Sequence, residues 1–329
     1  MSSIADWIDT ALDRSVVLGY GRPGLWLRRR LPGWPSDPPR LDGKVVLVTG
    51  ASSGIGLAAS GMLARLGAHV LALARNEERA DQAVAQIRRA APAGQVEPLA
   101  CDVSDLSQLR ALAQRLAAEH ERLDVLINNA GAMPPERRRT AAGHELMFAT
   151  HVLAPFALIA WTQELLERAA PSRVINVSSG GMYTRAIPCD DLESDRDSYS
   201  PARIYAATKR ELVVISEEWA RRLRGRGVAV HAMHPGWADT GAVKQALPRF
   251  HAATRLILRS PQEGADTIVW LAGAPEALVG VDGFWHDRRP RPTRHPLGAP
   301  EEDERCRAAL WRYCESIVRG ADGESAQPG

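Results

Sequence analysis

Hydrophobic and polar positions follow two different rhythms from Lys44 onward. Short runs rich in β-branched residues predict buried strands, and the longer amphipathic segments between them predict helices. The strands that we expect are Lys44–Thr49, His69–Ala74, Val96–Ala100, Val125–Asn128, Arg173–Val177, Val228–Met233 and one near Val281–Trp285. Repeated strand–helix units build a parallel sheet that helices cover on both faces. The pattern therefore predicts one doubly wound α/β domain with a seven-stranded parallel sheet.

The first forty residues follow a different pattern. Apolar residues recur at helical spacing from Ile4 to Leu12, and a basic, aromatic stretch at 24–34 and a proline-rich link at 35–39 follow them. This segment could make peripheral contact with a membrane, because Trp26 and its neighbours combine apolar and basic side chains. We favour a helix that packs on its own domain or on a second subunit, because its polar face is acidic rather than basic.

The end of the chain predicts a further extension. The stretch Arg288–Pro300 is rich in proline and arginine and is expected to wrap the surface, and Glu301–Arg319 has the apolar spacing of a helix. We therefore divide the chain into an N-terminal helical extension and linker (1–40), a central α/β domain (41–287) and a C-terminal wrap and helix (288–329).

Composition excludes several functions. Lys and Arg number 41 against 39 for Asp and Glu, so the net charge of +2 gives no argument for a nucleic-acid partner. Four scattered cysteines, without a C-x-x-C pair or a histidine cluster at ligand spacing, predict neither a disulfide framework nor a metal site. The acidic N-terminus and the lack of an 18-residue apolar run argue against secretion and membrane spanning. We expect a cytoplasmic protein, and membrane association through the N-terminal segment is the alternative.

The most informative local motif follows the first predicted strand. That strand runs into Gly50-Ala51-Ser52-Ser53-Gly54-Ile55-Gly56, and a helical pattern begins at once. The N–H groups at a helix start bind a pyrophosphate when no side chain blocks its approach, which explains the glycines. We predict a dinucleotide site formed by Gly50, Ser52, Ser53, Gly54, Ile55 and Gly56.

The spacing Thr-Gly-x-x-x-Gly-x-Gly resembles that of the single-domain branch of the short-chain dehydrogenase/reductase family. Four further family motifs appear in order, namely Asp102-Val103, Asn128-Asn129-Ala130-Gly131, Tyr205-x-x-x-Lys209, and Pro235-Gly236 with Thr240. The resemblance covers about 41–285 and implies a Rossmann-fold oxidoreductase that forms a homodimer or homotetramer. The stretches 178–182 and 234–240 are most similar to one vertebrate branch of this family.

The resemblance also implies roles for these motifs in holding a nicotinamide dinucleotide. Asp102, followed by Val103, would hydrogen-bond the adenine edge, the segment Asn129-Ala130-Gly131 would line the adenosine ribose, and Thr240 after Pro235-Gly236 would hold the nicotinamide side. Each motif has a structural alternative: Asp102 could cap a helix, Asn128 and Asn129 could close a turn, and Pro235-Gly236 could be a strand exit.

The end of the second predicted strand indicates which dinucleotide binds. An acidic residue there would accept hydrogen bonds from both ribose hydroxyls of NAD and would repel the extra phosphate of NADP. This chain has Ala74 at that position, followed by Arg75, whose guanidinium can pair with a phosphate. We therefore predict NADP(H) as the cofactor, and the alternative is a solvated arginine that sets no preference.

Tyr205 and Lys209 are the candidates for chemistry on a carbonyl or alcohol. Reduction of a carbonyl leaves an alkoxide that must receive a proton, and a tyrosine can supply it if a nearby cation lowers its pKa from about 10. Lys209 lies four residues on, and so on the same helical face. By resemblance, Ser179 would hold the substrate oxygen, with Ser178 as the alternative and a purely structural role for both as a third reading.

One position departs from the family pattern. His151 stands where the family usually has an asparagine whose backbone carbonyl holds a water that connects the lysine to solvent, and Ala154 replaces a glycine. Three hypotheses follow, in order of preference: the His151 carbonyl still holds the water, the imidazole itself relays protons, or the relay is broken.

The segment after Gly236 bears on the substrate. Its apolar residues predict either a mostly apolar wall for a lipid-like carbonyl or alcohol or packing against the C-terminal helix. These residues are Trp237, Val243, Leu247, Phe250, Leu256, Ile257 and Leu258. The alternative function is a catalytically weak NADP(H)-binding sensor or interaction module.

Overall fold

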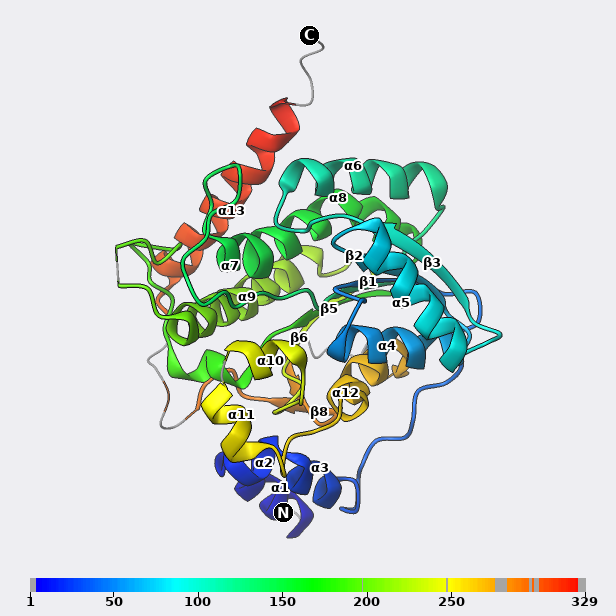
Figure 1. Cartoon of the computed structure of the whole chain (residues 1–329), viewed down its shortest axis with the longest axis vertical. Coiled ribbons are helices and arrows are strands. Elements are labelled where there is room, and N and C mark those ends of the chain that lie inside the picture. The colour runs from blue at the N-terminus through cyan, green and yellow to red at the C-terminus, as the bar shows by residue number, and fades with distance from the viewer. Residues whose placement is uncertain are drawn as a thin grey trace.

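A mostly parallel sheet forms the centre of the molecule (Figure 1). The computed structural model describes residues 4–196, 198–246, 248–275, 283–295, 298 and 302–324. The strands are β1 (Val45–Thr49), β2 (His69–Ala74), β3 (Gln95–Ala100), β4 (Val125–Asn128), β5 (Ser172–Val177), β6 (Val228–Met233), β7 (Phe284–His286) and β8 (Arg289–Arg291). They lie in the order β3-β2-β1-β4-β5-β6-β7-β8, and β1 to β7 are parallel. The doubly wound Rossmann-type fold is confirmed, and the first six strands lie within one residue of their predicted bounds.

Helices cover both faces of the sheet, as the amphipathic segments predict (Figure 1). On one face, α4 (Gly54–Arg65), α5 (Glu77–Ala90) and α12 (Pro261–Gly273) bury apolar side chains such as Leu63 and Ile268. The other face is covered by α6 (Leu106–Glu119), α8 (Ala154–Arg168), α9 (Pro201–Leu223) and the C-terminal α13 (Glu304–Glu324). The strand order reverses between β1 and β4, and ligands of such sheets bind at the carboxyl ends beside that reversal.

The sheet has eight strands rather than the seven that we predicted. The additional strand, β8, pairs antiparallel with β7 through a two-residue turn made of Asp287 and Arg288. Both turn residues have positive φ, 51° and 56°, a conformation that tight hairpins require and that usually selects glycine or asparagine. Because the turn lacks those residues, the sequence gives no hairpin signal, and part of the predicted surface wrap is this strand.

The N-terminal extension folds into α1 (Ile4–Arg14), α2 (Val17–Tyr20) and α3 (Arg22–Arg28), and it packs on its own domain, as favoured from the sequence. The orientation of α1 is the opposite of what a helix on a protein core normally has. Its acidic side faces inward, where Asp9 pairs with Arg28 at 2.7 Å and with Arg291 at 2.7 Å. The apolar side, with Trp7, faces solvent.

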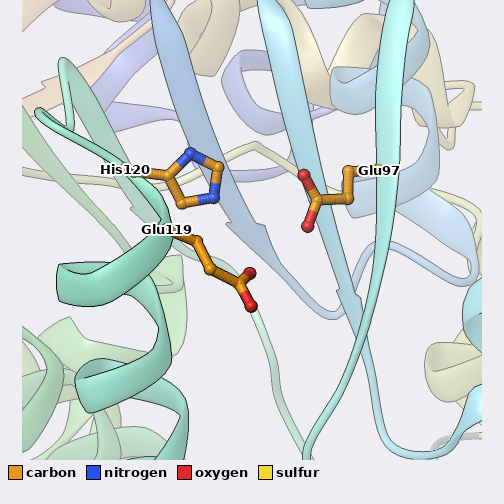
Figure 2. A group of neighbouring side chains, drawn as sticks. All are labelled: Glu97, Glu119 and His120. Carbon is orange, nitrogen blue, oxygen red and sulfur yellow. The ribbon is translucent and has the colours of Figure 1, made fainter.

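The end of α6 and strand β3 bring together Glu97, Glu119 and His120, whose ligand atoms lie within 4.8 Å of one another (Figure 2). Arg115 lies 3.5 Å from a carboxylate oxygen of Glu97 and 2.9 Å from one of Glu119. The guanidinium therefore supplies the positive charge that this pair of carboxylates requires.

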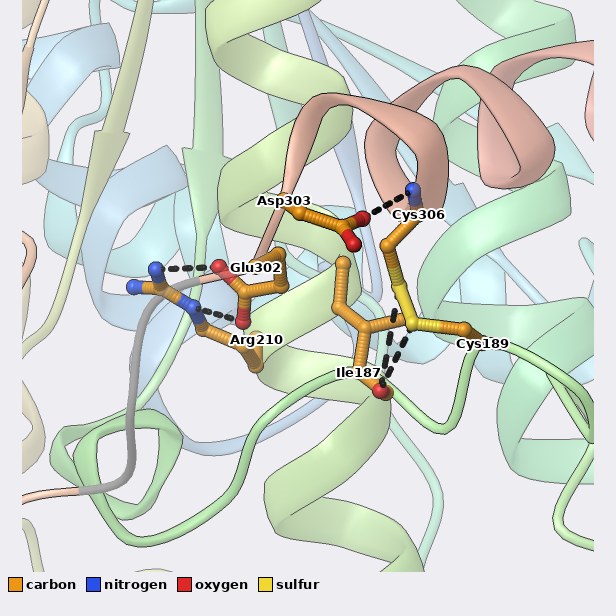
Figure 3. The surroundings of a disulfide bond; sticks show 6 residues. All are labelled: Ile187, Cys189, Arg210, Glu302, Asp303 and Cys306. Atoms are coloured by element: carbon orange, nitrogen blue, oxygen red, sulfur yellow. Dashed lines mark hydrogen bonds and ion pairs between the residues drawn. A yellow bond between two sulfur atoms is a disulfide. The ribbon is translucent and has the colours of Figure 1, made fainter.

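A disulfide joins Cys189 to Cys306, with 5.1 Å between their Cα atoms (Figure 3). It connects the loop after β5 to the start of α13, next to the buried ion pair of Arg210 and Glu302. The prediction of no disulfide is therefore wrong, because a bond between residues 117 positions apart leaves no local spacing motif.

One helical stretch among the described residues, Leu146–Arg168, is long and apolar enough to cross a membrane, although the sequence lacks an uninterrupted apolar run. It consists of α7 (Leu146–Phe148), the π-helical turn η1 (Ala149–Leu153) and α8. Most of it is buried against the sheet, which is the environment of a core helix.

Candidate active site

A cleft of about 610 Å³ opens at the carboxyl ends of the parallel strands, beside the reversal of strand order. Every predicted site residue except His151 lines it, from the glycine loop to Tyr205 and Lys209 and on to Thr240. The topology explains this grouping, because each motif follows a strand and all of these strands end at the same edge.

The glycine loop leaves one wall of the cleft open for a phosphate. Gly50 has a φ of 68°, and a Cβ atom at Gly56 would lie 2.3 Å from the carbonyl oxygen of Gly50. Helix α4 begins directly after Ser53, whose side chain makes no capping hydrogen bond. The first N–H groups of α4 therefore remain available to an anion, and these residues fit the pyrophosphate of a dinucleotide.

Asn129 fastens the end of β4 to the end of β1. Its amide Nδ2 donates to the Thr49 carbonyl at 2.9 Å, and the backbone N–H groups of Asn129 and Ala130 donate to the Thr49 hydroxyl at 2.9 and 3.0 Å. The neighbouring Asn128, the last residue of β4, donates from its side-chain amide to the side-chain oxygen of Asn176 on β5 at 2.8 Å. These amides therefore do more than close a turn, since they fix the spacing of the strand ends around the cleft.

The far end of the cleft is basic. Ala74 is buried at the end of β2, and the exposed Arg75 lies 3.6 Å from a carboxylate oxygen of Asp102. Asp102 also accepts hydrogen bonds from the N–H and hydroxyl of Ser104, whereas Asp105 caps α6, so Asp102 is not a helix cap. Arg79, one turn beyond Arg75, lines the same end. Arg79 was not among the predicted site residues, although its spacing of four residues from Arg75 was the available signal.

Tyr205, Ser179 and Lys209 meet in the middle of the cleft. Ser179 lies beside Tyr205, and the Lys209 ammonium donates to the Val177 carbonyl at 2.8 Å and lies 5.7 Å from the centre of the tyrosine ring. Burial raises the pKa of Tyr205, opposed by the Ser179 hydroxyl, and burial lowers the pKa of Lys209 to about 7. The lowered tyrosine pKa that we expected is absent here, because desolvation outweighs the opposing effect of Ser179.

The neighbouring serine has a different environment. The hydroxyl of Ser178 donates to the backbone carbonyl of Lys209 at 2.8 Å and is buried. That bond ties the end of β5 to α9, which is the structural role that the sequence left open for either serine. Both serines line the cleft, and Ser179, which caps the short helix η2 (Gly180–Thr184), is the one whose hydroxyl is not bonded to α9.

His151 lies on η1, behind the cleft rather than in its wall. Its Nε2 accepts a hydrogen bond from the N–H of Ala132 at 3.0 Å, and its Nδ1 lies 2.9 Å from the hydroxyl oxygen of Thr208, which donates to the Tyr205 carbonyl. This arrangement fixes a neutral ring with its proton on Nδ1. Burial and, to a smaller extent, Lys209 lower the pKa of His151 well below its ordinary value. The geometry gives the imidazole a positioning role between the 129–132 loop and α9.

Replacing His151 with alanine is expected to destabilise the fold by about 1–3 kcal/mol, because the N–H of Ala132 loses its buried acceptor. The pH profile of turnover should keep its shape, since an imidazole that stays neutral neither takes up nor releases a proton during the reaction. Denaturant unfolding and a pH–rate series measure the two effects. His151→Asn, which restores the residue usual in the family, is the companion variant, and the loss of a limb of the pH profile in either variant would instead identify the imidazole as a proton carrier.

Apolar rings line the outer part of the cleft. Trp237 contacts Phe250 of the helix α11 (Pro248–Thr254) edge to face, with the ring centroids 5.0 Å apart. The Trp237 N–H donates to the carbonyl oxygen of Tyr20 in the N-terminal extension at 2.8 Å. Leu256 does not belong to this wall, because its side chain is exposed, and α13 packs on α9 and α6 instead. Predicted residues 243 and 247 lie outside the described side chains.

The arrangement of the glycine loop, the tyrosine, the lysine and the serine defines a class of enzyme. A family model described as short chain dehydrogenase matches residues 44–189. The chain is also 36% identical over 319 residues to retinol dehydrogenase 14 of Mus musculus, an alignment that covers 89% of this chain and 94% of that protein. The chain therefore belongs to the short-chain dehydrogenase/reductase family of oxidoreductases.

Within the family, the chain is close to one branch. It is 38% identical over 273 residues to dehydrogenase/reductase SDR family member 12 of Bos taurus, covering 81% of this chain and 84% of that protein. The vertebrate branch that the sequence indicated is thus confirmed. Among solved structures, the Pseudomonas aeruginosa RhlG/NADP active-site complex is similar with a TM-score of 0.60 and 28% identity, covering 74% of this chain and 94% of that chain.

Proposed function

We propose that the chain is an NADP(H)-dependent oxidoreductase that transfers hydride between nicotinamide and the carbonyl or alcohol carbon of an apolar substrate. The observation that carries this proposal is that Tyr205, Ser179 and Lys209 line the same cleft as the glycine loop. When bound, the nicotinamide supplies or accepts the hydride.

The side chains of the cleft then handle the oxygen and the proton. In the reducing direction, the Ser179 hydroxyl holds the carbonyl oxygen, and the Tyr205 phenol donates its proton as the carbonyl electron pair moves onto that oxygen. Lys209 favours the phenolate that remains. As in the family resemblance, the backbone carbonyl of His151 would hold the water that returns a proton toward Lys209.

The charges at the end of β2 favour NADP(H) over NAD(H). Ala74 provides no acceptor for the ribose hydroxyls, and Arg75 and Arg79 offer two guanidinium groups to a phosphate. The solved structure with NADP among the structural relatives supports this preference.

Replacing Arg75 with aspartate is expected to weaken NADPH binding by about tenfold to a hundredfold, because a charge-assisted contact to the phosphate is lost and a repulsive charge replaces it. The same change should strengthen NADH binding, since a carboxylate accepts hydrogen bonds from both ribose hydroxyls. Titration of protein fluorescence with each cofactor measures the two affinities. Arg89→Asp, near the far end of the following helix α5, is the matched control, and a wild-type protein that binds NAD(H) at least as tightly as NADP(H) would refute the preference.

The aromatic rings of Trp237 and Phe250, which line the outer cleft, favour an apolar substrate. Retinol is the apolar alcohol in the name of one relative. Oxidation of NADPH measured over a panel of ketones, aldehydes and quinones tests the reaction, and turnover that favours long apolar carbonyls is expected. The rival function, a weakly catalytic NADP(H)-binding module, is favoured only by the histidine at position 151, and cofactor binding without turnover across the panel would establish it.

A further inference from the structure

Large apolar side chains that face solvent gather at one end of the molecule. Among the described residues, six such side chains are 52–84% exposed, namely Ile4, Trp7, Val17, Leu18, Trp26 and Leu256. Five of them belong to the helices α1, α2 and α3, and Leu256 follows α11 at the same end (Figure 1). Large exposed apolar patches on soluble proteins mark interaction surfaces. We name these six residues the apolar end.

The exposure of the apolar end follows from charge pairing that α1 makes on its other side. The carboxylate of Asp9 is buried between Arg28 and Arg291, and Asp13 lies 3.5 Å from Arg291. Turning the helix over to bury Trp7 would expose these ion pairs or leave Arg28 buried without Asp9, which is costly. The orientation is therefore built into the fold. It also removes our sequence-based argument against a membrane, because the acidic face is not the one that meets solvent.

The helices α1, α2 and α3 pack closely against one another. A Cβ atom at Gly19 would lie 2.0 Å from the Leu12 carbonyl oxygen, and one at Gly24 would lie 2.4 Å from that of Leu18, so two glycines allow the three helices to pack closely. The N–H of Arg22 donates to the carbonyl oxygen of Ile257 at 2.7 Å, which places Leu256 beside α3.

Basic side chains accompany the apolar end. Arg14, Arg30 and Arg255 are exposed on the same segments, and the Arg30 guanidinium lies 3.8 Å from the centre of the Trp26 ring. The exposed acid of α1 is Asp6, which lies 3.5 Å from Arg289. Tryptophan and arginine side by side are typical of the membrane–water interface, where the ring enters the headgroup layer and the cation meets lipid phosphates.

We propose that the apolar end docks on the surface of an anionic lipid bilayer. A second copy of the chain is a poorer occupant, because two such surfaces face to face would bring the same cations together. A bilayer accepts the apolar side chains and attracts the cations at the same time.

The docking surface is connected to the cleft. The backbone carbonyl oxygen of Tyr20 in α2 accepts a hydrogen bond from the backbone N–H of Trp237 in the outer cleft. Helix α11 contributes Phe250 to the cleft, and the turn that follows this helix contains Leu256. If the proposed function holds, an apolar alcohol or ketone dissolved in the bilayer would meet the enzyme on this side. The docking itself does not depend on that function.

Sedimentation of the full-length protein with vesicles tests the proposal, without cofactor or substrate. We expect binding to vesicles of phosphatidylcholine and phosphatidylglycerol, weaker binding to phosphatidylcholine alone, and a decrease with added salt. The variant Trp7→Ser/Trp26→Ser should bind at least about tenfold more weakly. Arg14→Glu/Arg30→Glu should lose the preference for the anionic lipid, and Arg65→Glu/Arg89→Glu, on the exposed surfaces of α4 and α5, is the matched control.

Unchanged melting temperature and cofactor affinity in each variant would show that the fold is retained. A wild-type protein that sediments with neither vesicle would overturn the proposal, as would a tryptophan variant that binds vesicles as well as the wild type. If the wild type does not bind vesicles but self-associates, and the tryptophan variant is monomeric, the occupant is a second copy and the proposal is wrong. Because vesicle binding is measured without substrate, its failure is distinguishable from a failure of the enzymatic proposal.

Discussion

Tyr205→Phe is expected to lower carbonyl turnover by about 10²–10⁴-fold, the contribution typical of a general acid. The substitution removes only the phenolic oxygen of Tyr205, a half-buried residue that lines the cleft beside Ser179. No other phenol lines the cleft among the described residues, so the proton that the alkoxide requires loses its donor. Stopped-flow or steady-state oxidation of NADPH with the best carbonyl of the panel measures the loss.

The control for this variant is cofactor binding, which should stay within about twofold of the wild type, because the ring remains in place. Tyr199→Phe is a matched variant, since this tyrosine precedes α9 and donates to the Pro134 carbonyl outside the cleft lining. A Tyr205→Phe protein with wild-type turnover would show that the proton comes from another group, and the assignment of Tyr205 would fall.

The second large effect is expected at Asp287→Asn, which should destabilise the fold by about 3–5 kcal/mol. Asp287 is buried in the β7–β8 turn and pairs with Arg259 at 2.6 Å and with Arg28 at 2.7 Å. Both guanidinium groups are also buried, so an uncharged amide leaves two cations without their shared counter-charge. Urea denaturation followed by circular dichroism measures the change.

The same carboxylate predicts a dependence of stability on pH. Burial alone would raise the pKa of Asp287, but Arg259, His286 and Arg28 outweigh it and hold the pKa well below its ordinary value. The contribution of Asp287 to the free energy of unfolding is therefore complete above the unfolded-state pKa of about 3.9, and it decreases as the pH falls below that value. Asp42→Asn, which breaks the exposed pair with Arg40, is the control and should change stability little. An Asp287→Asn protein as stable as the wild type would show that Arg28 and Arg259 find other partners.

Much of the cleft could be predicted because its motifs are local. The glycine loop must follow a strand and begin a helix, and Tyr205 and Lys209 must share a helical face, so each feature is determined by a few consecutive residues. Once the alternation of strands and helices predicts a parallel sheet, the topology brings the motifs to one edge. The family resemblance assigned His151 to the relay position that serves Lys209, while the bonds that give its imidazole a positioning role depend on Ala132 and Thr208 and emerge only from the fold.

The features that sequence reasoning missed depend on residues far apart in the chain. The disulfide joins Cys189 to Cys306, and no spacing rule connects positions so distant. The orientation of α1 is decided by Arg28 and Arg291, whereas the helical pattern of α1 alone predicts that its apolar side is buried. A long-range charge pair can thus reverse the inference that amphipathicity supports.

The ring of Tyr20 rests against the backbone of Gly180, where a Cβ atom would lie 2.7 Å from the ring carbon Cε2. Gly180 directly follows Ser179, and the carbonyl oxygen of the same tyrosine holds Trp237. One residue of the N-terminal extension therefore contacts both the turn after Ser179 and Trp237 of the outer cleft. A change in the position of Tyr20 is expected to disturb the turn after Ser179 and the outer cleft together.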